Sequence, residues 1–177
     1  MSERDLVDRE LRLRAWTEAD APTIAALIDG EEQISLWLDL IPQPYAETHA
    51  LQWLRGEVGR GPSEITWALE TDGTVGGSIG ATPQGDDVWE VGYWTRAEMR
   101  GRGLMPRALG LVARWLLETQ GAQRIYLRAD PENVASCRVA EKAGFVREGV
   151  LRSAHWNARQ QRRQSWTIYS VLPGELD

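Results

Sequence analysis

Two arginines and two glycines alternate near the middle of the chain, where they could hold an anion. The run Arg100-Gly101-Arg102-Gly103 continues with Leu104-Met105-Pro106, which begins a helix predicted over 104–119. Glycines leave the backbone N–H groups accessible to a ligand, and the start of a helix adds unpaired N–H groups and a partial positive charge. Arginine side chains, including Arg107, supply fixed charge at the rim. This segment predicts a phosphate-binding loop, and the alternative interpretation is a simple tight turn.

Composition places these residues in one globular domain. The chain has 177 residues, of which 42% are hydrophobic and 26% charged, and its formal net charge of −6 argues against a general nucleic-acid binder. It has one cysteine, Cys137, and two histidines, His49 and His155, that are far apart, so we expect neither an internal disulfide nor a metal site. Because no leader sequence and no apolar run of ~20 residues is found, we expect a cytoplasmic protein without membrane contact.

Apolar periodicity predicts an α+β domain with one mixed, mostly antiparallel sheet flanked by helices. Residues 1–10 are expected to form an N-terminal tail, and residues 11–172 a single domain. The predicted elements are, in chain order, a strand at Leu11–Ala15, helices at Glu18–Ile28, within Gly30–Pro44 and at Thr48–Leu54, strands at Glu64–Glu70, Val75–Ala81 and Val88–Trp94, a helix at Leu104–Thr119, a strand at Gln123–Leu127, a helix at Val134–Ala143, and strands at Val150–Trp156 and Ser165–Leu172.

The loop and the segments around it resemble the GNAT superfamily of acetyl-CoA-dependent N-acetyltransferases. The family signature Q/R-x-x-G-x-G/A is matched by Arg100, Gly103 and Met105, where methionine replaces the usual small residue. Further matching runs are EVGYWTRAEMRGRGLMPRAL from Glu90, Asn133-Val134-Ala135-Ser136, Glu141-Lys142-Ala143-Gly144-Phe145 and Glu148-Gly149, which look like the branch of the ribosomal-protein N-terminal acetyltransferases RimJ and RimL. This resemblance spans about Leu11 to Leu172 and implies the GNAT fold.

The resemblance also implies where acetyl-CoA binds. Its pantetheine arm would lie between the strands predicted at Val88–Trp94 and Gln123–Leu127, bonded to the backbone near Tyr93, Trp94 and Thr95. The amides of Arg100–Pro106 would take the pyrophosphate. Asn133 matches the position that bonds the cofactor arm, although it would also serve as an ordinary helix N-cap. Lys142 would reach the outer phosphate.

Three residues are candidates for proton transfer. Ser136 matches the serine that the family is proposed to use as the acid that protonates the departing thiolate. Many relatives use a tyrosine four residues further along, but Ala140 stands there in this chain, so Ser136 is the preferred candidate for the acid. Glu90 is the first candidate for the base, by analogy with strand glutamates of the superfamily, and His155 is the second. Water alone remains a third solution. The structural alternatives are a helix serine, a salt-bridge glutamate and an ordinary strand histidine.

The acceptor is expected to be a primary amine that attacks the thioester of acetyl-CoA directly, without an acyl-enzyme. Deprotonating an ε-amine with a pKa of about 10.4 costs about 4.6 kcal/mol at pH 7, whereas an α-amine costs about 1 kcal/mol. A protein N-terminus is slightly favoured, and a small-molecule amine such as an antibiotic or polyamine is the alternative. A non-catalytic acyl-CoA-binding regulatory module is the alternative from another class, and a homodimer is possible.

Nine tryptophans stand out in this composition. Trp67, Trp89, Trp94, Trp115 and Trp166 are expected to pack within the sheet or under the long helix. Trp37 and Trp53 lie in the helical region that lines the acceptor groove in the family, and we predict that they bind substrate. The run Arg159–Arg163, expected between the last two strands, could favour an acidic substrate or a ribosomal partner.

Overall fold

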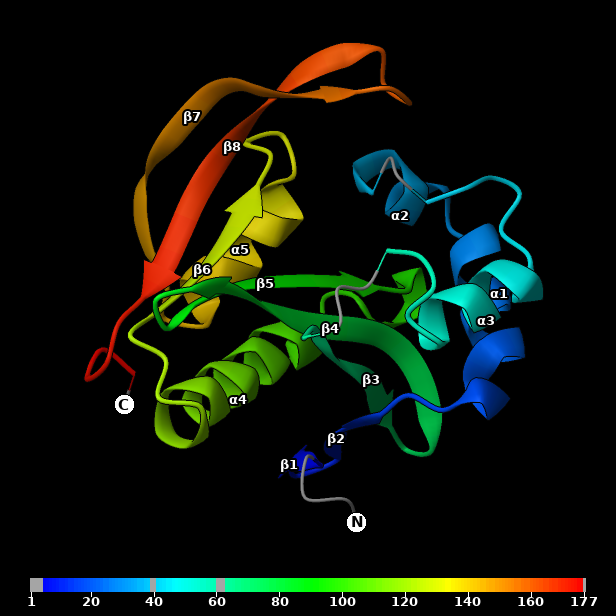
Figure 1. Cartoon of the computed structure of the whole chain (residues 1–177), viewed down its shortest axis with the longest axis horizontal. Coiled ribbons are helices and arrows are strands. Elements are labelled where there is room, and N and C mark those ends of the chain that lie inside the picture. The colour runs from blue at the N-terminus through cyan, green and yellow to red at the C-terminus, as the bar shows by residue number, and fades with distance from the viewer. Residues whose placement is uncertain (1–4, 39–40, 60–62, 177) are drawn as a thin grey trace. The chain divides into compact units, whose positions relative to one another are not determined.

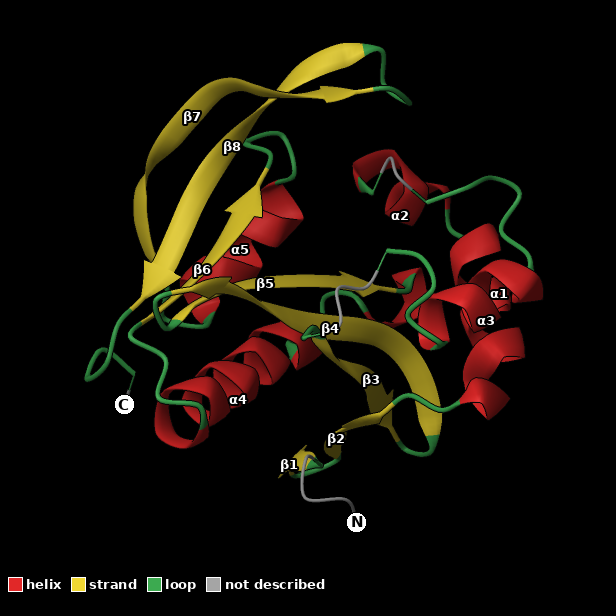
Figure 2. Ribbon diagram, in the orientation of Figure 1, coloured by secondary structure: helices red, strands yellow, loops and turns green. Residues whose placement is uncertain are grey.

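A computed structural model describes residues 5–38, 41–59 and 63–176, which divide into two compact units. The first unit comprises the chain up to Gly80 together with Tyr93–Arg102, and the second comprises Ala81–Gly92 together with the chain from Gly103 onward. The elements of both units are labelled in Figure 1 and coloured by type in Figure 2.

The first unit combines short strands with a group of helices. Its elements are β1 (Leu6–Asp8), β2 (Leu11–Ala15), the 3-10 helix η1 (Glu18–Asp20), α1 (Ala21–Asp29), α2 (Glu32–Trp37), α3 (Glu47–Leu54), β3 (Ile65–Thr71), the first part of β4 (Thr74–Gly85), the end of β5 (Val88–Thr95) and the 3-10 helix η2 (Ala97–Met99). In β2, buried Leu11 and Leu13 alternate with arginines, which is the pattern of a strand with one face in the core.

Helices α1 and α3 pack against each other around a small apolar cluster. Ala21, Ile24, Ile28, Tyr45 and Ala50 form its buried centre. Asp20 fixes the start of this region, because its Oδ2 accepts hydrogen bonds from the backbone N–H and the hydroxyl of Thr17, at 2.8 and 2.9 Å. Residues 39–40, within the predicted Gly30–Pro44 helical region, lie outside the described part of the chain.

The second unit contains the remaining strands and two helices. Its elements after β5 are α4 (Leu104–Thr119), β6 (Arg124–Ala129), α5 (Val134–Lys142), β7 (Val146–Asn157) and β8 (Arg162–Val171). Helix α4 buries a stripe that includes Leu109, Val112 and Leu116, all 0% exposed. Strands β7 and β8 form a long curved hairpin (Figure 1), and β8 lies between β7 and β6.

Strand pairing confirms the predicted α+β class with a mixed, mostly antiparallel sheet. The order is β1-β2-β3-β4-β5-β6-β8-β7, in which β5 and β6 are parallel, whereas β1–β2, β2–β3, β6–β8 and β7–β8 are antiparallel. Several bounds differ from expectation: β4 and β7 are longer than predicted, and two further segments change their assignment. The segment expected as a tail contains β1, which pairs with β2 through Leu6 and Leu13, and Arg162 and Arg163 belong to β8 rather than to the preceding loop. None of the helices in the described ranges has the length and apolar character needed to span a bilayer.

Candidate functional site

The glycine-arginine loop connects η2 to the start of α4. Gly101 and Gly103 have φ angles of +75° and +74°, in the left-handed region that favours glycine. A Cβ added at either position would meet nothing within 4 Å, so the backbone faces open space. Leu104 and Met105 bury their side chains, and their N–H groups belong to the first helical turn, where no intrahelical acceptor exists. Pro106 has no N–H and therefore donates no hydrogen bond to a ligand.

Arg100 anchors this loop instead of projecting freely from it. Its Nη2 donates to Glu31 Oε2 at 3.0 Å, and its Nε donates to the Thr95 carbonyl at 2.9 Å. Glu31 also accepts the Ala97 backbone N–H at 2.6 Å, so one carboxylate holds two points of the segment. Arg102 is more available to a ligand, because its side chain is 47% exposed and its nearest carboxylate, on Asp72, is 4.0 Å away.

The end of β5 packs tightly on its own unit. Tyr93, Trp94 and Thr95 are half-buried, and Trp94 contacts the apolar cluster of α1 and α3. A Cβ at Gly77 would lie 2.6 Å from the Trp94 carbonyl oxygen, so the two backbones approach closely only because residue 77 is glycine. This close contact with Gly77 holds the backbone of Trp94, which is one of the residues predicted to bind the pantetheine arm.

The ladder between β5 and β6 is short. Its pairs are Val88↔Arg124, Trp89↔Ile125 and Glu90↔Tyr126. Within the second unit, Val91 and Gly92 follow Glu90 in β5 without a partner in the described residues of β6. A Cβ at Gly92 would meet nothing within 4 Å. Backbone groups that β6 leaves unpaired beside open space can bond an extended amide-containing ligand.

Asn133 and Ser136 meet at the start of α5. Asn133 Oδ1 accepts the Ser136 backbone N–H at 3.1 Å, so asparagine is the N-cap, and its amide nitrogen is not used in this bond. Asp130 supports the turn: its backbone oxygen accepts the Asn133 N–H at 2.8 Å, and its carboxylate accepts the Glu132 N–H at 2.8 Å and Arg162 Nη2 at 3.0 Å. The side chain of Asp130 is 2% exposed, which makes this support rigid.

The remaining predicted cofactor residue lies at the other end of the same helix. Lys142 is exposed and ends α5. Its neighbour Glu141 accepts a hydrogen bond from the Tyr169 hydroxyl at 3.1 Å, which ties the end of α5 to β8. Burial, together with nearby Cys137 and Glu141, raises the pKa of Tyr169, so this hydroxyl remains a donor at neutral pH.

Glu90 lies on the face of the sheet opposite Tyr169 and is held by two donors. Arg128 Nε donates to Glu90 Oε1 at 2.6 Å, and the Tyr126 hydroxyl is 3.2 Å from Oε2. Burial raises the pKa of Tyr126, and the negative charge of Glu90 adds to this effect. The structure therefore contains the salt bridge that was weighed as the alternative role of this glutamate.

Trp166 connects Arg128 to His155 on the same face. The Arg128 guanidinium carbon lies 5.7 Å from the indole centroid, and the His155 ring stacks on Trp166 at 5.6 Å with an interplanar angle of 28°. A register shift between Leu151 and His155 places extra residues in β7 at this point. Arg163 holds the bulge, since its Nε and Nη2 donate to the Ser153 carbonyl at 3.2 and 3.0 Å.

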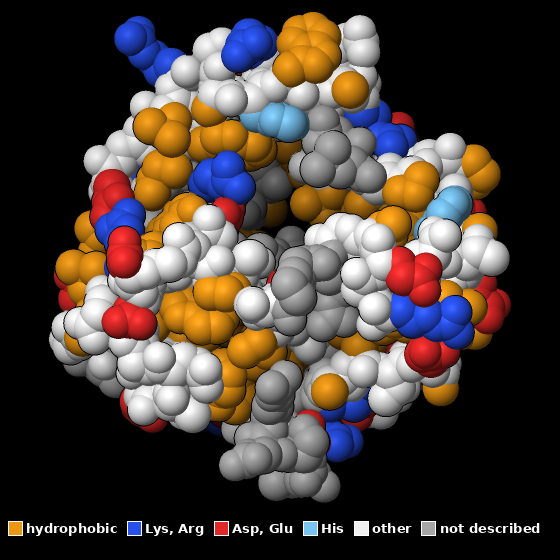
Figure 3. All heavy atoms as spheres, in the orientation of Figure 1, with side chains coloured by type: hydrophobic (Ala, Val, Ile, Leu, Met, Phe, Trp, Pro, Cys, Tyr) orange, Lys and Arg blue, Asp and Glu red, His pale blue; other side chains and the backbone are white. Residues whose placement is uncertain are grey.

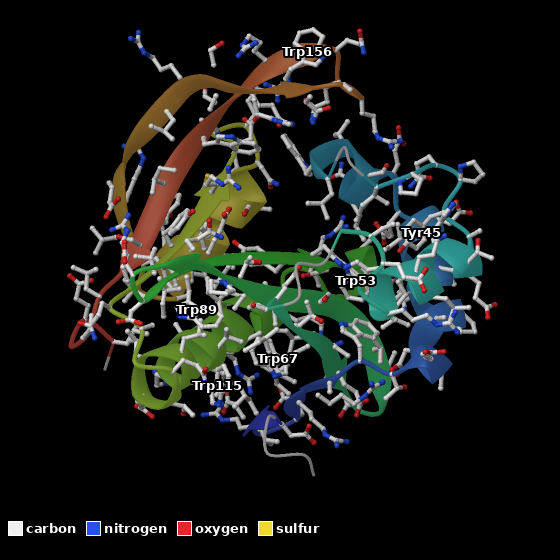
Figure 4. All side chains as sticks on the ribbon, viewed as in Figure 1. Tyr45, Trp53, Trp67, Trp89, Trp115 and Trp156 are labelled. Atoms are coloured by element: carbon white, nitrogen blue, oxygen red, sulfur yellow. The ribbon has the colours of Figure 1, made fainter. Side chains whose placement is uncertain are left out.

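The two predicted substrate tryptophans belong to the first unit. Trp53 is half-buried on α3 and meets Trp16 edge to face at 6.2 Å, close to Tyr45 of the apolar cluster (Figure 4). Trp16 Nε1 donates to Ser78 Oγ at 3.2 Å, which fixes the pair. Trp37 is the half-buried last residue of α2. Trp67 is 0% exposed and is a packing residue, as expected.

In the second unit, contacts lead from Glu90 through Arg128 and Trp166 to His155. The sequence predicted the first and the last of these residues as site residues, but not those between them. Glu90 and His155 were candidates, whereas Arg128 and Tyr126 were not, and Trp166 was expected only to pack. Strand alternation could have indicated Tyr126 and Arg128. They are two residues apart on β6, the neighbour of β5, and therefore lie on the same face of the sheet. Glu31 carried no sequence signal, since its role depends on folding against Arg100.

Residues 10–146 match a family model described as an acetyltransferase (GNAT) domain, and the chain therefore belongs to the GNAT family of acetyltransferases. The expected enzyme class and its donor, acetyl-CoA, are confirmed at this level. Over 154 residues the chain is 27% identical to the Bacillus subtilis (strain 168) protein named "Putative ribosomal N-acetyltransferase YdaF", covering 82% of this chain and 83% of that protein.

Solved structures agree with this assignment at the level of the fold. The ribosomal-protein-S5-alanine acetyltransferase from Vibrio fischeri superimposes with a TM-score of 0.84 at 19% identity, covering 99% of this chain and 100% of that one. RimL, the ribosomal L7/L12 alpha-N-protein acetyltransferase in complex with coenzyme A, superimposes with a TM-score of 0.85 at 18% identity, covering 96% of this chain and 98% of that one.

Proposed function

We propose that the enzyme transfers the acetyl group of acetyl-CoA to a primary amine, and that a protein α-amine is the preferred acceptor. The short β5–β6 ladder carries the first half of the proposal. The backbone of Val91 and Gly92 has no partner in the β5–β6 ladder, and a Cβ added at Gly92 would meet nothing within 4 Å. An arm that contains amide groups, as pantetheine does, can complete those backbone hydrogen bonds in the manner of an added strand.

Other residues are proposed to bind the remaining parts of acetyl-CoA, and their local geometry supports these roles. Backbone N–H groups of Gly101 to Met105 would bind the pyrophosphate, with Arg102 adding charge and Lys142 meeting the outer phosphate. The Asn133 amide nitrogen would donate to the arm while its oxygen caps α5. Acetyl-CoA brings the activated thioester, and Ser136, positioned by that cap, would give a proton to the departing thiolate.

We assign the two candidates for the base different roles. Both oxygens of Glu90 already accept hydrogen bonds, one of them from a guanidinium. Glu90 is therefore better suited to holding Arg128 than to taking a proton from the amine. His155, stacked on Trp166 at the end of the same contacts, would accept the proton.

The preference for an α-amine rests on energy and on the relatives. Deprotonating an α-amine at pH 7 costs only about 1 kcal/mol of free energy, so a single histidine or a water molecule suffices as the proton acceptor. Two solved structures named above are acetyltransferases of ribosomal proteins by name, and the Bacillus subtilis relative is named as a "putative ribosomal N-acetyltransferase". A small-molecule amine held by Trp37 and Trp53 is the second candidate, and a non-catalytic acyl-CoA-binding module is disfavoured by the ordered pair Asn133 and Ser136.

The test is an acceptor screen with acetyl-CoA that reads thiol release and confirms products by mass spectrometry. Peptides with free N-termini, the same peptides with blocked N-termini and a lysine side chain, polyamines and aminoglycosides are compared, with hydrolysis subtracted. Acetylation at the α-amine is expected. Turnover confined to small amines would select the second candidate, and donor binding without turnover on any amine would select the binding module. Ser136→Ala should lower kcat, whereas Ser63→Ala, on the surface, should not.

A further inference from the structure

The Arg128 guanidinium has no role in the proposed acetyl transfer. Arg128 lies on β6, which is flanked by β5 and β8, and its sequence neighbours Leu127 and Ala129 are 1% and 3% exposed. Its own side chain is 45% exposed. Register places it on the same sheet face as Tyr126, Glu90 and Trp166. A cation in the central part of a sheet, on an accessible face, requires an explanation beyond solubility.

Two contacts fix the orientation of this guanidinium. Glu90 accepts from Nε at 2.6 Å, and the Trp166 ring lies 5.7 Å from the guanidinium carbon. The contact with Glu90 uses Nε alone, so within the described residues the four N–H groups on the two terminal nitrogens are left for a ligand. A fork of this shape matches a carboxylate, and a guanidinium that is already oriented loses less entropy when it binds one.

The charges of the neighbouring β7–β8 hairpin are mostly paired or on the other face of the sheet. Glu148 is bound by Arg124, and Arg162 is paired with Asp130 and Glu132. Arg163 bonds to Ser153 and alternates along β8 with Gln164 and Trp166, so it belongs to the face opposite Arg128. An acidic ligand on this face would therefore be recognised by Arg128 itself. Over this hairpin, Lys or Arg side chains and hydrophobic side chains lie next to one another (Figure 3), and Val150, Leu151 and Trp156 are among the exposed apolar residues.

The aromatic ring of this face is not available to a cationic acceptor. Trp166 already has the Arg128 guanidinium and the His155 ring beside it. A polyamine or an aminoglycoside would bring further positive charge to this ring and would be repelled. An acceptor with an acidic group close to its amine would instead meet complementary charge.

We propose that Arg128 is a specificity residue that binds a carboxylate of the acceptor, so that the preferred substrates are protein N-termini with Asp or Glu among their first residues. This inference rests on the proposed α-amine acetylation. It adds that the residues after the amine are selected by charge. Glu90 acts as a positioning residue in this selection, because it holds the guanidinium through Nε.

The experiment compares matched peptides that differ only in charge. Peptides beginning with Ser or Ala carry Asp or Glu at positions two and three, and their partners carry Asn or Gln. For the wild type we expect kcat/KM for the acidic peptide to exceed that for the neutral peptide by roughly tenfold or more. A ratio of this size corresponds to the free energy of one charge-assisted hydrogen bond. The difference should appear in KM and should decrease at high ionic strength.

Variants assign the effect to the residue. Arg128→Gln should reduce the ratio of kcat/KM between the acidic and the neutral peptide to within about threefold, and Arg128→Lys should restore part of that ratio. Arg147→Gln is the matched control, since Arg147 is exposed on the same hairpin but pairs with Tyr169 on the other face. Its preference should equal that of the wild type.

The outcomes separate the two proposals. Equal acetylation of acidic and neutral peptides by the wild type would overturn the role of Arg128 and leave α-amine acetylation intact, without any need for a folded variant. A preference that persists in both Arg128 variants would also overturn it. Acetyl-CoA binding with no acetylation of any peptide would overturn the proposed function, and this inference with it.

Discussion

Glu31 and Arg100 are 69 positions apart in the chain, yet Glu31 Oε2 accepts a hydrogen bond from Arg100 Nη2 at 3.0 Å. The same carboxylate accepts the Ala97 N–H, so a negative charge lies against the segment that leads into the loop proposed to bind pyrophosphate. This pair sets both the shape and the charge of the loop.

Glu31→Gln should therefore tighten acetyl-CoA binding. An amide can keep the bond to the Ala97 N–H, while removing the carboxylate releases the charge of Arg100 toward the phosphates. We expect Kd to fall about twofold to fivefold at low ionic strength and the gain to shrink in 0.5 M salt, measured by isothermal titration. Glu98→Gln is the control, because Glu98 is an exposed carboxylate paired with Arg96 in the same segment. An equal gain in both variants would mean that general charge, and not this pair, sets the affinity.

Gly103→Trp should abolish acetyl-CoA binding. Gly103 has a φ of +74° and open space where its Cβ would be, so a large side chain would occupy the space proposed for the pyrophosphate. Gly121→Trp is a matched control at the end of α4, because Gly121 also has a positive φ, +69°, with nothing within 4 Å. Both variants should lose similar stability in thermal unfolding, but only the first should lose donor binding. Retained binding in Gly103→Trp would remove the loop from the donor site.

His155→Ala should lower kcat. If His155 accepts the amine proton, its removal leaves water as the acceptor, and we expect kcat to drop about 10²-fold or more in steady-state assays with saturating peptide and acetyl-CoA. Glu90→Gln should largely retain kcat and change KM for acidic peptides instead. A large loss of kcat in Glu90→Gln, with kcat retained in His155→Ala, would exchange the two assignments.

Local patterns were sufficient for most elements of the fold, because periodicity is a property of neighbouring residues. The predicted helix over Leu104–Thr119 agrees with α4 at both ends, and the strand at Val88–Trp94 agrees with β5 to within one residue. Strand β1 was missed because three residues are too few to show alternation. The bulge before His155 depends on Arg163 bonding to Ser153, which no local pattern indicates.

The candidate site was predictable only where a motif is contiguous. The loop from Arg100 and the pair Asn133 and Ser136 are of this kind. The Arg128–Glu90 bond joins residues 38 positions apart and requires the parallel register of β5 with β6, and it therefore became visible only in the fold. This register is a property of the whole sheet, so composition and spacing do not determine it.

Acid should weaken the second unit through Glu148. Hydrogen bonds from Arg124, at 2.6 Å to each carboxylate oxygen, and from Ser170 lower the pKa of Glu148 from its ordinary 4.5 to about 2. A carboxylate with a lowered folded pKa stabilises the fold above its unfolded pKa and loses that contribution as pH falls toward the folded one. The contribution is thus present above about pH 4.5 and decreases between pH 4.5 and about 2.

Glu148→Gln is the variant that isolates this effect. Because the side chain is 40% exposed, screening limits the contribution to about 1 kcal/mol or less. Urea unfolding at pH 6 should show the variant less stable by about this amount, and the gap should narrow at pH 3. Glu118→Gln, on the exposed face of α4, should match the wild type at both pH values. A gap that is constant with pH would show that Glu148 acts through packing and not through its charge.

Gln164→Met should stabilise the protein. Gln164 is 0% exposed on β8, opposite His155 on β7, and neither atom of its side-chain amide has a hydrogen-bond partner among the described residues. An unsatisfied buried amide costs about 1–3 kcal/mol, and methionine has nearly the same shape without the polar groups. We expect the free energy of unfolding to rise by about 1 kcal/mol in urea titrations. Gln123→Met, at an exposed glutamine of the same unit, should change stability by no more than about 0.5 kcal/mol. A loss of stability in Gln164→Met would contradict a net cost of the buried amide at this position.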